Sequence, residues 1–251
     1  MNADREPSSG AGVPGDATFA TTRWSVVLAA GHPSSATAGK ALAELCQAYW
    51  YPLYAYVRRR GRSREDAEDL VQSFFGDLLE RNPFGSLSAE RGRFRAFLLA
   101  ALKHSLANDW DRAHRQKRGG GVAPLSLDWN EAEARFHREP ADLDSPDRAY
   151  DRAWAVALLE HVVVRLEEEC TADGRGALFR VTRGFLMLGE EAIPHAQAAR
   201  ELGMDEGAVR IAVHRLRKRY RELLREEISQ TLQNPAQTAD ELRSLQAALM
   251  A

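Results

Sequence analysis

One stretch decides the fold: Pro194-His-Ala-Gln-Ala-Ala-Arg-Glu-Leu-Gly203-Met-Asp-Glu-Gly-Ala-Val-Arg-Ile-Ala-Val-His214-Arg-Leu-Arg-Lys-Arg-Tyr220. The pattern predicts a helix, a tight turn and a second helix that is rich in cations. Gly203 can adopt the left-handed backbone that ends the first helix. Asp205 is placed to cap the second helix, whose positive end favours a carboxylate. The stretch therefore predicts a helix-turn-helix.

The two helices of this motif divide their residues between an inner and an outer side. The apolar residues expected where the helices face each other are Ala198, Leu202, Val209, Ala212 and Leu216. The cations of the second helix are Arg210, His214, Arg215, Arg217, Lys218, Arg219 and Arg221. An ordinary helical hairpin with a solvated basic face has a similar charge run. The agreement of glycine, cap and one-sided charge instead favours a helix that lies in the major groove of DNA.

Charge is strongly segregated along the 251 residues, although the formal net charge is only -2. Eight Lys or Arg residues stand against two Asp residues over 91–118, and seven stand against one Glu over 208–225. Residues 65–80 hold six Asp or Glu residues and no cation. Two basic blocks and one acidic block predict two contacts with nucleic acid and one with a different partner.

Composition also indicates the setting in which the protein works. Cys46 and Cys170 lack metal-ligand spacing and lie in apolar, helical surroundings, which is typical of buried free thiols in a reducing compartment. No apolar run is long enough to span a bilayer. Residues 1–20 hold no hydrophobic segment of a signal peptide, and we expect a disordered tail there. We expect a cytoplasmic protein with no membrane contact.

The hydrophobic periodicity is helical almost throughout, which predicts an all-α fold of two small helical domains joined by an acidic linker. Pro52 is expected to kink the helix at 36–60 or to start a second segment. The other helices are expected at about 21–30, 63–81, 93–115, 147–170 and 174–189, then in the helix-turn-helix and a short C-terminal helix. The predicted divisions are a tail at 1–20, a domain at 21–118, a linker at 119–146, a domain at 147–232 and a C-terminal tail at 233–251.

The first basic block ends the helix expected at 93–115. The stripe through 97, 101, 104, 108, 112 and 115 begins apolar and turns polar. Phosphate contacts are expected from Arg112, Arg115, Lys117 and Arg118. His104 and Asn108 are candidates to read base edges or to position the strand. Taken alone, this block fits a solvated helix end equally well.

The chain resembles the extracytoplasmic-function (ECF) group of bacterial RNA polymerase sigma factors over about 40–118 and 150–225. In the first half the resemblance rests on Tyr49-Trp-Tyr-Pro-Leu-Tyr-Ala-Tyr, Glu65-Asp-Ala-Glu-Asp-Leu-Val-Gln-Ser-Phe-Phe75, Phe94-Arg-Ala-Phe-Leu-Leu and Asn108-Asp-Trp-Asp-Arg112. In the second half it rests on Ala198-Ala-Arg-Glu-Leu-Gly-Met, Gly207-Ala-Val-Arg and His214-Arg-Leu-Arg-Lys-Arg. His104 and Ile211-Ala212 depart from many relatives, so base preference is not carried over.

The resemblance implies a sigma region 2-like bundle that docks on the clamp of the largest polymerase subunit and opens the −10 element. It implies a sigma region 4-like helix-turn-helix that reads the −35 element as duplex. It places the polymerase-facing surface at Asp66, Asp69, Gln72, Phe75 and Leu78, although an exposed acidic helix with an apolar core face also fits these residues. It assigns the contacts that hold the separated DNA strand to Arg91, Arg93 and Arg95. It assigns −35 recognition to Gln197, Glu206, Gly207, Ala208, Arg210, Ile211, His214, Arg215, Arg217 and Lys218.

We therefore expect a promoter-specificity subunit of RNA polymerase with no catalysis, cofactor or metal of its own. The first alternative is a helix-turn-helix regulator that binds operator DNA as a homodimer, although neither a dimerising coiled coil nor a ligand domain is evident. The second is a helical scaffold that binds polymerase without touching DNA, and an enzyme acting on nucleic acid is a more distant one. The promoter sequence, the activating signal and the existence of an anti-sigma factor stay open.

Overall fold

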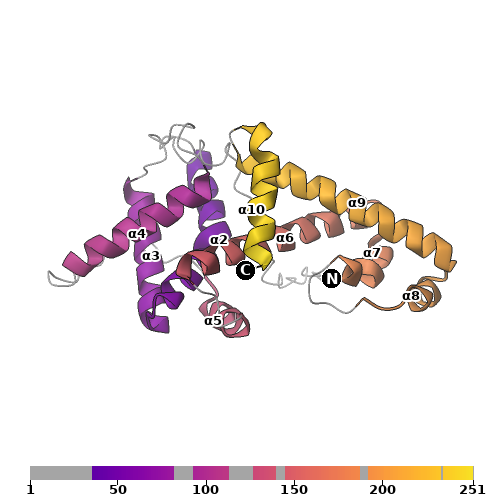
Figure 1. Ribbon diagram of the computed structural model, residues 1–251, viewed down its shortest axis with the longest axis horizontal. Coiled ribbons are helices and arrows are strands. Elements are labelled where there is room, and N and C mark those ends of the chain that lie inside the picture. Colours follow the sequence, from indigo (N-terminus) through magenta and orange to yellow (C-terminus); the bar gives the residue numbers. More distant parts are fainter. Residues whose placement is uncertain are drawn as a thin grey trace, which may run out of the picture.

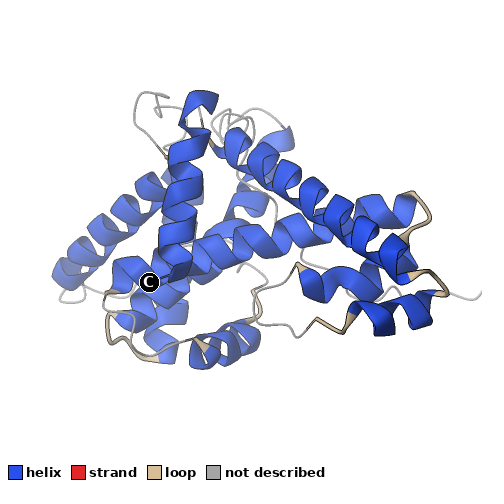
Figure 2. Cartoon of the chain, turned by 45° about the vertical axis from the view of Figure 1, so that its right-hand side comes forward, coloured by secondary structure: helices blue, strands red, loops and turns tan. Residues whose placement is uncertain are grey.

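The computed structural model describes residues 36–81, 93–112, 127–139, 145–186, 192–232 and 234–250. These ranges are helical and contain no strand, so the predicted all-α class is confirmed (Figures 1 and 2). The α-helices in them are α2 (Ala36–Arg59), α3 (Arg64–Arg81), α4 (Phe94–Arg112), α5 (Trp129–Arg138), α6 (Pro146–Ala172), α7 (Gly176–Thr182), α8 (His195–Leu202), α9 (Glu206–Thr231) and α10 (Thr238–Met250). Short 3-10 turns follow α7 at Arg183–Phe185 and precede α10 at Pro235–Gln237.

Local signals set most of the helix ends. The Ser63 hydroxyl accepts a hydrogen bond from the Asp66 backbone amide at 3.0 Å, which caps α3. Ser145 caps α6 in the same way, with Pro146 in its first turn. Pro52 lies inside α2, which continues through it as one helix. The helix predicted at 21–30 and the end of the one predicted at 93–115 lie outside the described residues.

The first core fills the space between α2, α3 and α4. Tyr54, Phe75 and Leu98, one from each helix, are buried in it. The ring of Tyr49 meets that of Phe94 edge to face, with centroids 5.5 Å apart. Cys46 is a buried free thiol there, as predicted, and burial raises its pKa to about 12.

Helix α6 belongs to two cores. Its first half buries Tyr150 and Trp154 in the core of α2, α3 and α4. Its second half buries Val162 and Leu166 in a second core with α7 and α9. Packing therefore continues across the predicted domain boundary near residue 146, and the division into two domains stays a prediction.

Part of the expected acidic linker is a helix that packs against the first core. In α5, Ala132 is buried, and Glu133 accepts hydrogen bonds from Tyr54 and from Arg58, the latter at 2.7 Å. Just after α5, Glu139 accepts a hydrogen bond from the Tyr51 hydroxyl at 2.7 Å. Two of the acidic residues that suggested a linker therefore fasten α5 to α2.

The turn between α8 and α9 has the geometry that the sequence predicts. Gly203 ends α8 with φ of 63° and ψ of 30°, in the left-handed region. The Asp205 carboxylate accepts hydrogen bonds from the amides of Gly207 and Ala208 at 2.8 and 3.3 Å, which caps α9. The backbone thus fixes the angle at which α9 leaves α8.

Two glycines provide a matched test of this turn. Gly203→Ala should lower the free energy of unfolding by about 1 kcal/mol, because a side chain disfavours positive φ. Gly76→Ala, inside α3, should raise it by about 1 kcal/mol, because alanine is the better helix former. An added Cβ meets no atom within 4 Å at either position, so backbone conformation alone separates the two variants. Urea unfolding midpoints would measure both changes. An unchanged midpoint for Gly203→Ala would contradict the left-handed backbone conformation assigned to Gly203.

Candidate nucleic-acid interface

The helix-turn-helix packs through small apolar residues. Ala198 and Ala199 of α8 are buried against Val209 and Val213 of α9. The predictions for Ala198 and Val209 are confirmed, and Leu202 packs at the edge of this cluster. Val213 takes the buried place expected for Ala212, which is half-buried. Leu216, predicted at this contact, packs instead in the core with α6 and α7, because it lies two turns beyond Val209.

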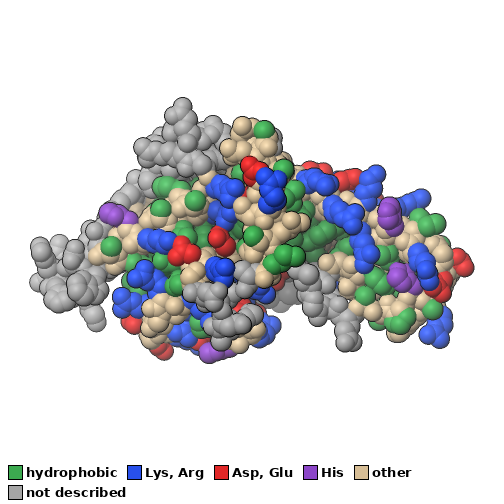
Figure 3. All heavy atoms as spheres, in the orientation of Figure 1, with side chains coloured by type: hydrophobic (Ala, Val, Ile, Leu, Met, Phe, Trp, Pro, Cys, Tyr) green, Lys and Arg blue, Asp and Glu red, His purple; other side chains and the backbone are tan. Residues whose placement is uncertain are grey.

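The outer side of α9 forms a continuous exposed surface. Figure 3 shows Lys and Arg side chains along this helix. Ile211 adds an apolar side chain that is 56% exposed, and Glu206 forms an ion pair with Arg210 at 2.5 Å. The predicted −35 residues that are exposed on α9 are Gly207, Arg210, Ile211, His214, Arg215, Arg217 and Lys218. Gln197, Glu206 and Ala208 are half-buried. The structure therefore brings the predicted recognition residues together.

Two arginines of α9 contact other segments of the protein. Arg217 donates from Nε and Nη2 to the carbonyl of Phe185, each at 3.2 Å. Arg219 forms two hydrogen bonds of 2.8 Å with Glu169 of α6. These bonds hold the pKa of Glu169 below its usual value and raise that of Arg219. Arg219 therefore joins α9 to α6 and is not part of the outer basic surface.

The cations at the start of α4 also have internal partners. Arg95 pairs with Glu241 of α10 at 2.8 Å and with Asp151 of α6, and its side chain is 11% exposed. Arg93 pairs with Glu241 at 2.7 Å. Acidic residues from distant helices therefore neutralise both side chains in this conformation, and their contact with DNA stays a prediction.

The rest of the first basic block is only partly described. His104 is exposed on α4, as a residue that contacts DNA must be. Asn108 and Arg112 lie in the last turns of α4, where the structure describes only the backbone. Arg91, Arg115, Lys117 and Arg118 lie outside the described residues.

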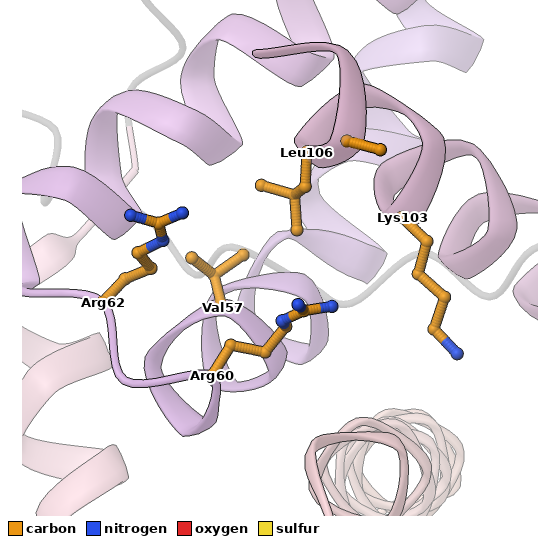
Figure 4. Close-up of a pocket in the computed structure, with 6 residues that line it drawn as sticks. Val57, Arg60, Arg62, Lys103 and Leu106 are labelled. Atoms are coloured by element: carbon orange, nitrogen blue, oxygen red, sulfur yellow. The ribbon is translucent and has the colours of Figure 1, made fainter. Parts of the chain in front are cut away.

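A basic hollow that was not predicted from the sequence opens beside α4. Its volume is about 410 Å³, and its lining residues are Val57, Arg60, Arg62, Lys103, Leu106 and Ala107. Figure 4 shows Val57 and Leu106 between the Arg62 and Lys103 side chains. Arg60 donates to the Tyr56 hydroxyl at 3.3 Å, and Lys103 pairs with Asp147. Three cations around an apolar floor suit the backbone of a nucleic acid. In the sequence, the four arginines within 58–62 are the feature that could have indicated this hollow.

The acidic helix α3 presents a smaller surface than expected. Asp66 and Asp69 are exposed and Gln72 is half-buried, in agreement with a docking surface. Phe75 and Leu78 are only 1% and 8% exposed, so their predicted place on that surface is wrong. They follow Val71 at helical spacing on the side of α3 that faces α2, and they belong to the core.

Comparison with known proteins gives one match. A family model described as ECF sigma factor matches residues 39–226, which is most of the chain and runs from α2 into α9. No curated protein and no solved structure gives a significant match. In the described part of the chain, none of the helices is long and apolar enough to cross a membrane. The same residues contain no cluster of three or more His, Cys, Asp or Glu that could hold a metal ion.

Proposed function

Because the chain belongs to the ECF sigma factor family, whose members act in transcription initiation, we propose that it binds the RNA polymerase core and directs it to promoters. The observation that carries this proposal is the exposed outer side of α9. It combines a helix-turn-helix set by Gly203 and Asp205 with exposed cations and an exposed Ile211. In this proposal the protein supplies specificity and performs no catalysis.

We propose that α9 enters the major groove of the −35 element. Arg210 and His214 are exposed and spaced to face the same groove. The exposed methyl groups of Ile211 suit contact with a thymine methyl group. The cations at Arg215, Arg217 and Lys218 suit phosphate contacts that set the register of the helix. Gln197, Glu206, Gly207 and Ala208 complete the proposed surface.

The first helical bundle is proposed to open the −10 element. Moving a base out of the stack costs a few kcal/mol, and strand contacts must offset that cost. His104, Asn108, Arg112, Arg115, Lys117 and Arg118 are proposed to contact DNA along and after α4. The basic hollow lined by Arg60 and Arg62 adds phosphate contacts next to that helix. Arg91, Arg93 and Arg95 are proposed to hold the separated strand once the ion pairs of Arg93 and Arg95 with Glu241 of α10 are broken.

Polymerase is proposed to dock on α3 through Asp66, Asp69 and Gln72. Carboxylates and an amide on one exposed side suit a basic partner such as the clamp of the largest subunit.

Transcription with purified core polymerase tests the proposed function. The full chain should give initiation at defined start sites from a pool of genomic promoter fragments. The control is core polymerase alone, which should give none. Tight operator binding as a dimer without polymerase would instead support a helix-turn-helix regulator. Polymerase binding without any DNA contact would support a scaffold.

Replacing Arg210 should change which promoters are chosen. If its guanidinium contacts a base edge, Arg210→Ala should cost roughly 1–3 kcal/mol and relax preference at one −35 position. Transcription from promoters randomised at single −35 positions would measure the change.

The contrasting variant is Arg62→Ala in the basic hollow. Loss of a phosphate contact should weaken binding evenly across sequences and reduce the slope of log affinity against log salt by about 1. Unchanged promoter choice in Arg210→Ala would remove that residue from the recognition surface.

Reversing the charge at Asp66 should weaken docking on polymerase. Asp66→Arg should lower affinity for the core enzyme, because it places a cation opposite the proposed basic partner, and should leave binding to −35 duplex unchanged. Glu168→Arg makes the same change at an exposed site on α6 and is the matched control. Unfolding curves should accompany both variants, since Asp66 also lies in the first turn of α3. Equal core affinity in Asp66→Arg and wild type would refute this docking surface.

A further inference from the structure

Helix α10 lies outside the residues matched by the family model and packs on the body of the protein. It spans Thr238–Met250 and follows the matched region, which ends at residue 226. Leu245 is buried, and Leu242 and Leu249 pack against the first core. Arg152 of α6 donates to the Leu249 carbonyl at 3.0 Å, which fastens the end of the helix. Figure 1 shows α10 crossing α6 beside the end of α9.

The contact of α10 with α4 is made by a buried carboxylate. Glu241 is 1% exposed, and its two oxygens lie 2.8 Å from Nε of Arg95 and 2.7 Å from Nε of Arg93. Arg93 also donates from Nη1 to the Ser244 hydroxyl at 3.1 Å, one turn further along α10. A buried charge is tolerated only with such partners, so this pair of arginines holds Glu241 in the core.

Arg95 is enclosed on its remaining sides. Its guanidinium carbon lies 4.3 Å from the ring centre of Trp154, and Asp151 pairs with it from α6. A guanidinium binds a phosphate and a carboxylate through the same N–H groups. A DNA phosphate can therefore reach Arg95 only if Glu241 gives up its place.

We propose that α10 is an intramolecular latch that competes with the −10 strand for Arg93 and Arg95. This inference rests on the proposed function, which assigns these two cations to the separated strand. In the latched state Glu241 occupies the anion position, and α10 joins the start of α4 to α6 and α9. In the released state the position of the Glu241 carboxylate is open to a phosphate, while Asp151 still lies beside Arg95.

Several features of α10 suit reversible release from the rest of the protein. Helix α10 has 13 residues, a length that is marginal for an isolated helix in water, so its order depends on docking. Its last residue that the structure describes, Met250, is 89% exposed. Asp151 remains beside Arg95 when Glu241 leaves, so Arg95 keeps one ion-pair partner in the released state.

The test compares Glu241→Gln with Asp240→Asn in the full chain. Glutamine keeps the size of the side chain but loses the charge that holds two arginines. Asp240→Asn removes the same charge from the neighbouring residue, which pairs with Arg243 on α10 itself. We expect Glu241→Gln to bind a short single-stranded oligonucleotide roughly 5- to 150-fold more tightly than wild type, the usual range for coupled sites. Asp240→Asn should bind as wild type does, and fluorescence anisotropy would measure all three affinities.

Equal or weaker binding by Glu241→Gln overturns the latch. If Glu241→Gln releases the whole of α10 from the rest of the protein, Arg93 and Arg95 lose the same partner. Tighter binding of the oligonucleotide is therefore still expected. Backbone hydrogen exchange on the wild-type protein gives a second readout. Saturation with the oligonucleotide should speed exchange in α10, and unchanged protection there overturns the proposal.

Failure of the latch and failure of the proposed function give different results. Tighter strand binding by Glu241→Gln with no core polymerase binding by either protein would contradict the sigma role and support the latch. Core binding and initiation by both proteins, with equal strand affinity, would support the sigma role and overturn the latch. No strand binding by either protein overturns the latch together with the −10 assignment.

Discussion

The arrangement of the molecule depends on a helix that is shared by two hydrophobic cores. Helix α6 has 27 residues and is about 40 Å long. Along it, every fourth position is buried: Tyr150, Trp154, Leu158, Val162, Leu166 and Cys170. A spacing of four in a helix of 3.6 residues per turn rotates the buried stripe by about 40° at each step, so the two ends of the stripe point to nearly opposite sides. One helix can therefore face the α2–α4 bundle with its first half and α7 and α9 with its second. The position of the helix-turn-helix relative to the bundle follows from this rotation.

Charge is used in two ways that composition alone does not separate. Some arginines join helices that are distant in sequence, as Arg58 does with α5, Arg95 with α6 and α10, and Arg219 with α6. These pairs are partly screened from water and act as positional contacts. Others, including Arg210 and Lys218, are exposed and each pairs with a glutamate of α9 itself, Glu206 and Glu222. A block of seven cations over 208–225 is thus a weaker basic surface than its count implies, because several of its members are paired with glutamates.

The sequence predicted what is determined locally and missed what depends on contacts between distant segments. Gly203 and Asp205 were predicted correctly because a left-handed turn and a helix cap are set by a few neighbouring residues. Phe75 and Leu78 were misplaced because the resemblance assigned them to a docking surface, although their helical spacing from Val71 already indicated the core. The helix inside the expected linker and the ion pairs at the start of α4 could not be predicted, because partners up to 148 positions apart, as Arg93 and Glu241 are, leave no local pattern. The residues proposed to touch DNA or polymerase remain predictions.

Sharing α6 and α10 between the two ends of the molecule has a thermodynamic consequence. Helix α10 contacts α6 and α9 as well as the start of α4, so a ligand that displaces Glu241 also changes the support of α9. Linkage requires any such coupling to be reciprocal: a ligand that changes the support of α9 must change the contact of α10 with Arg95 by the same free energy. In a protein with two separate DNA-binding surfaces, such coupling makes the affinity of each surface depend on the state of the other. Helix α6 takes part in the same competition for cations, because Asp151 pairs with Arg95 and Asp147 pairs with Lys103.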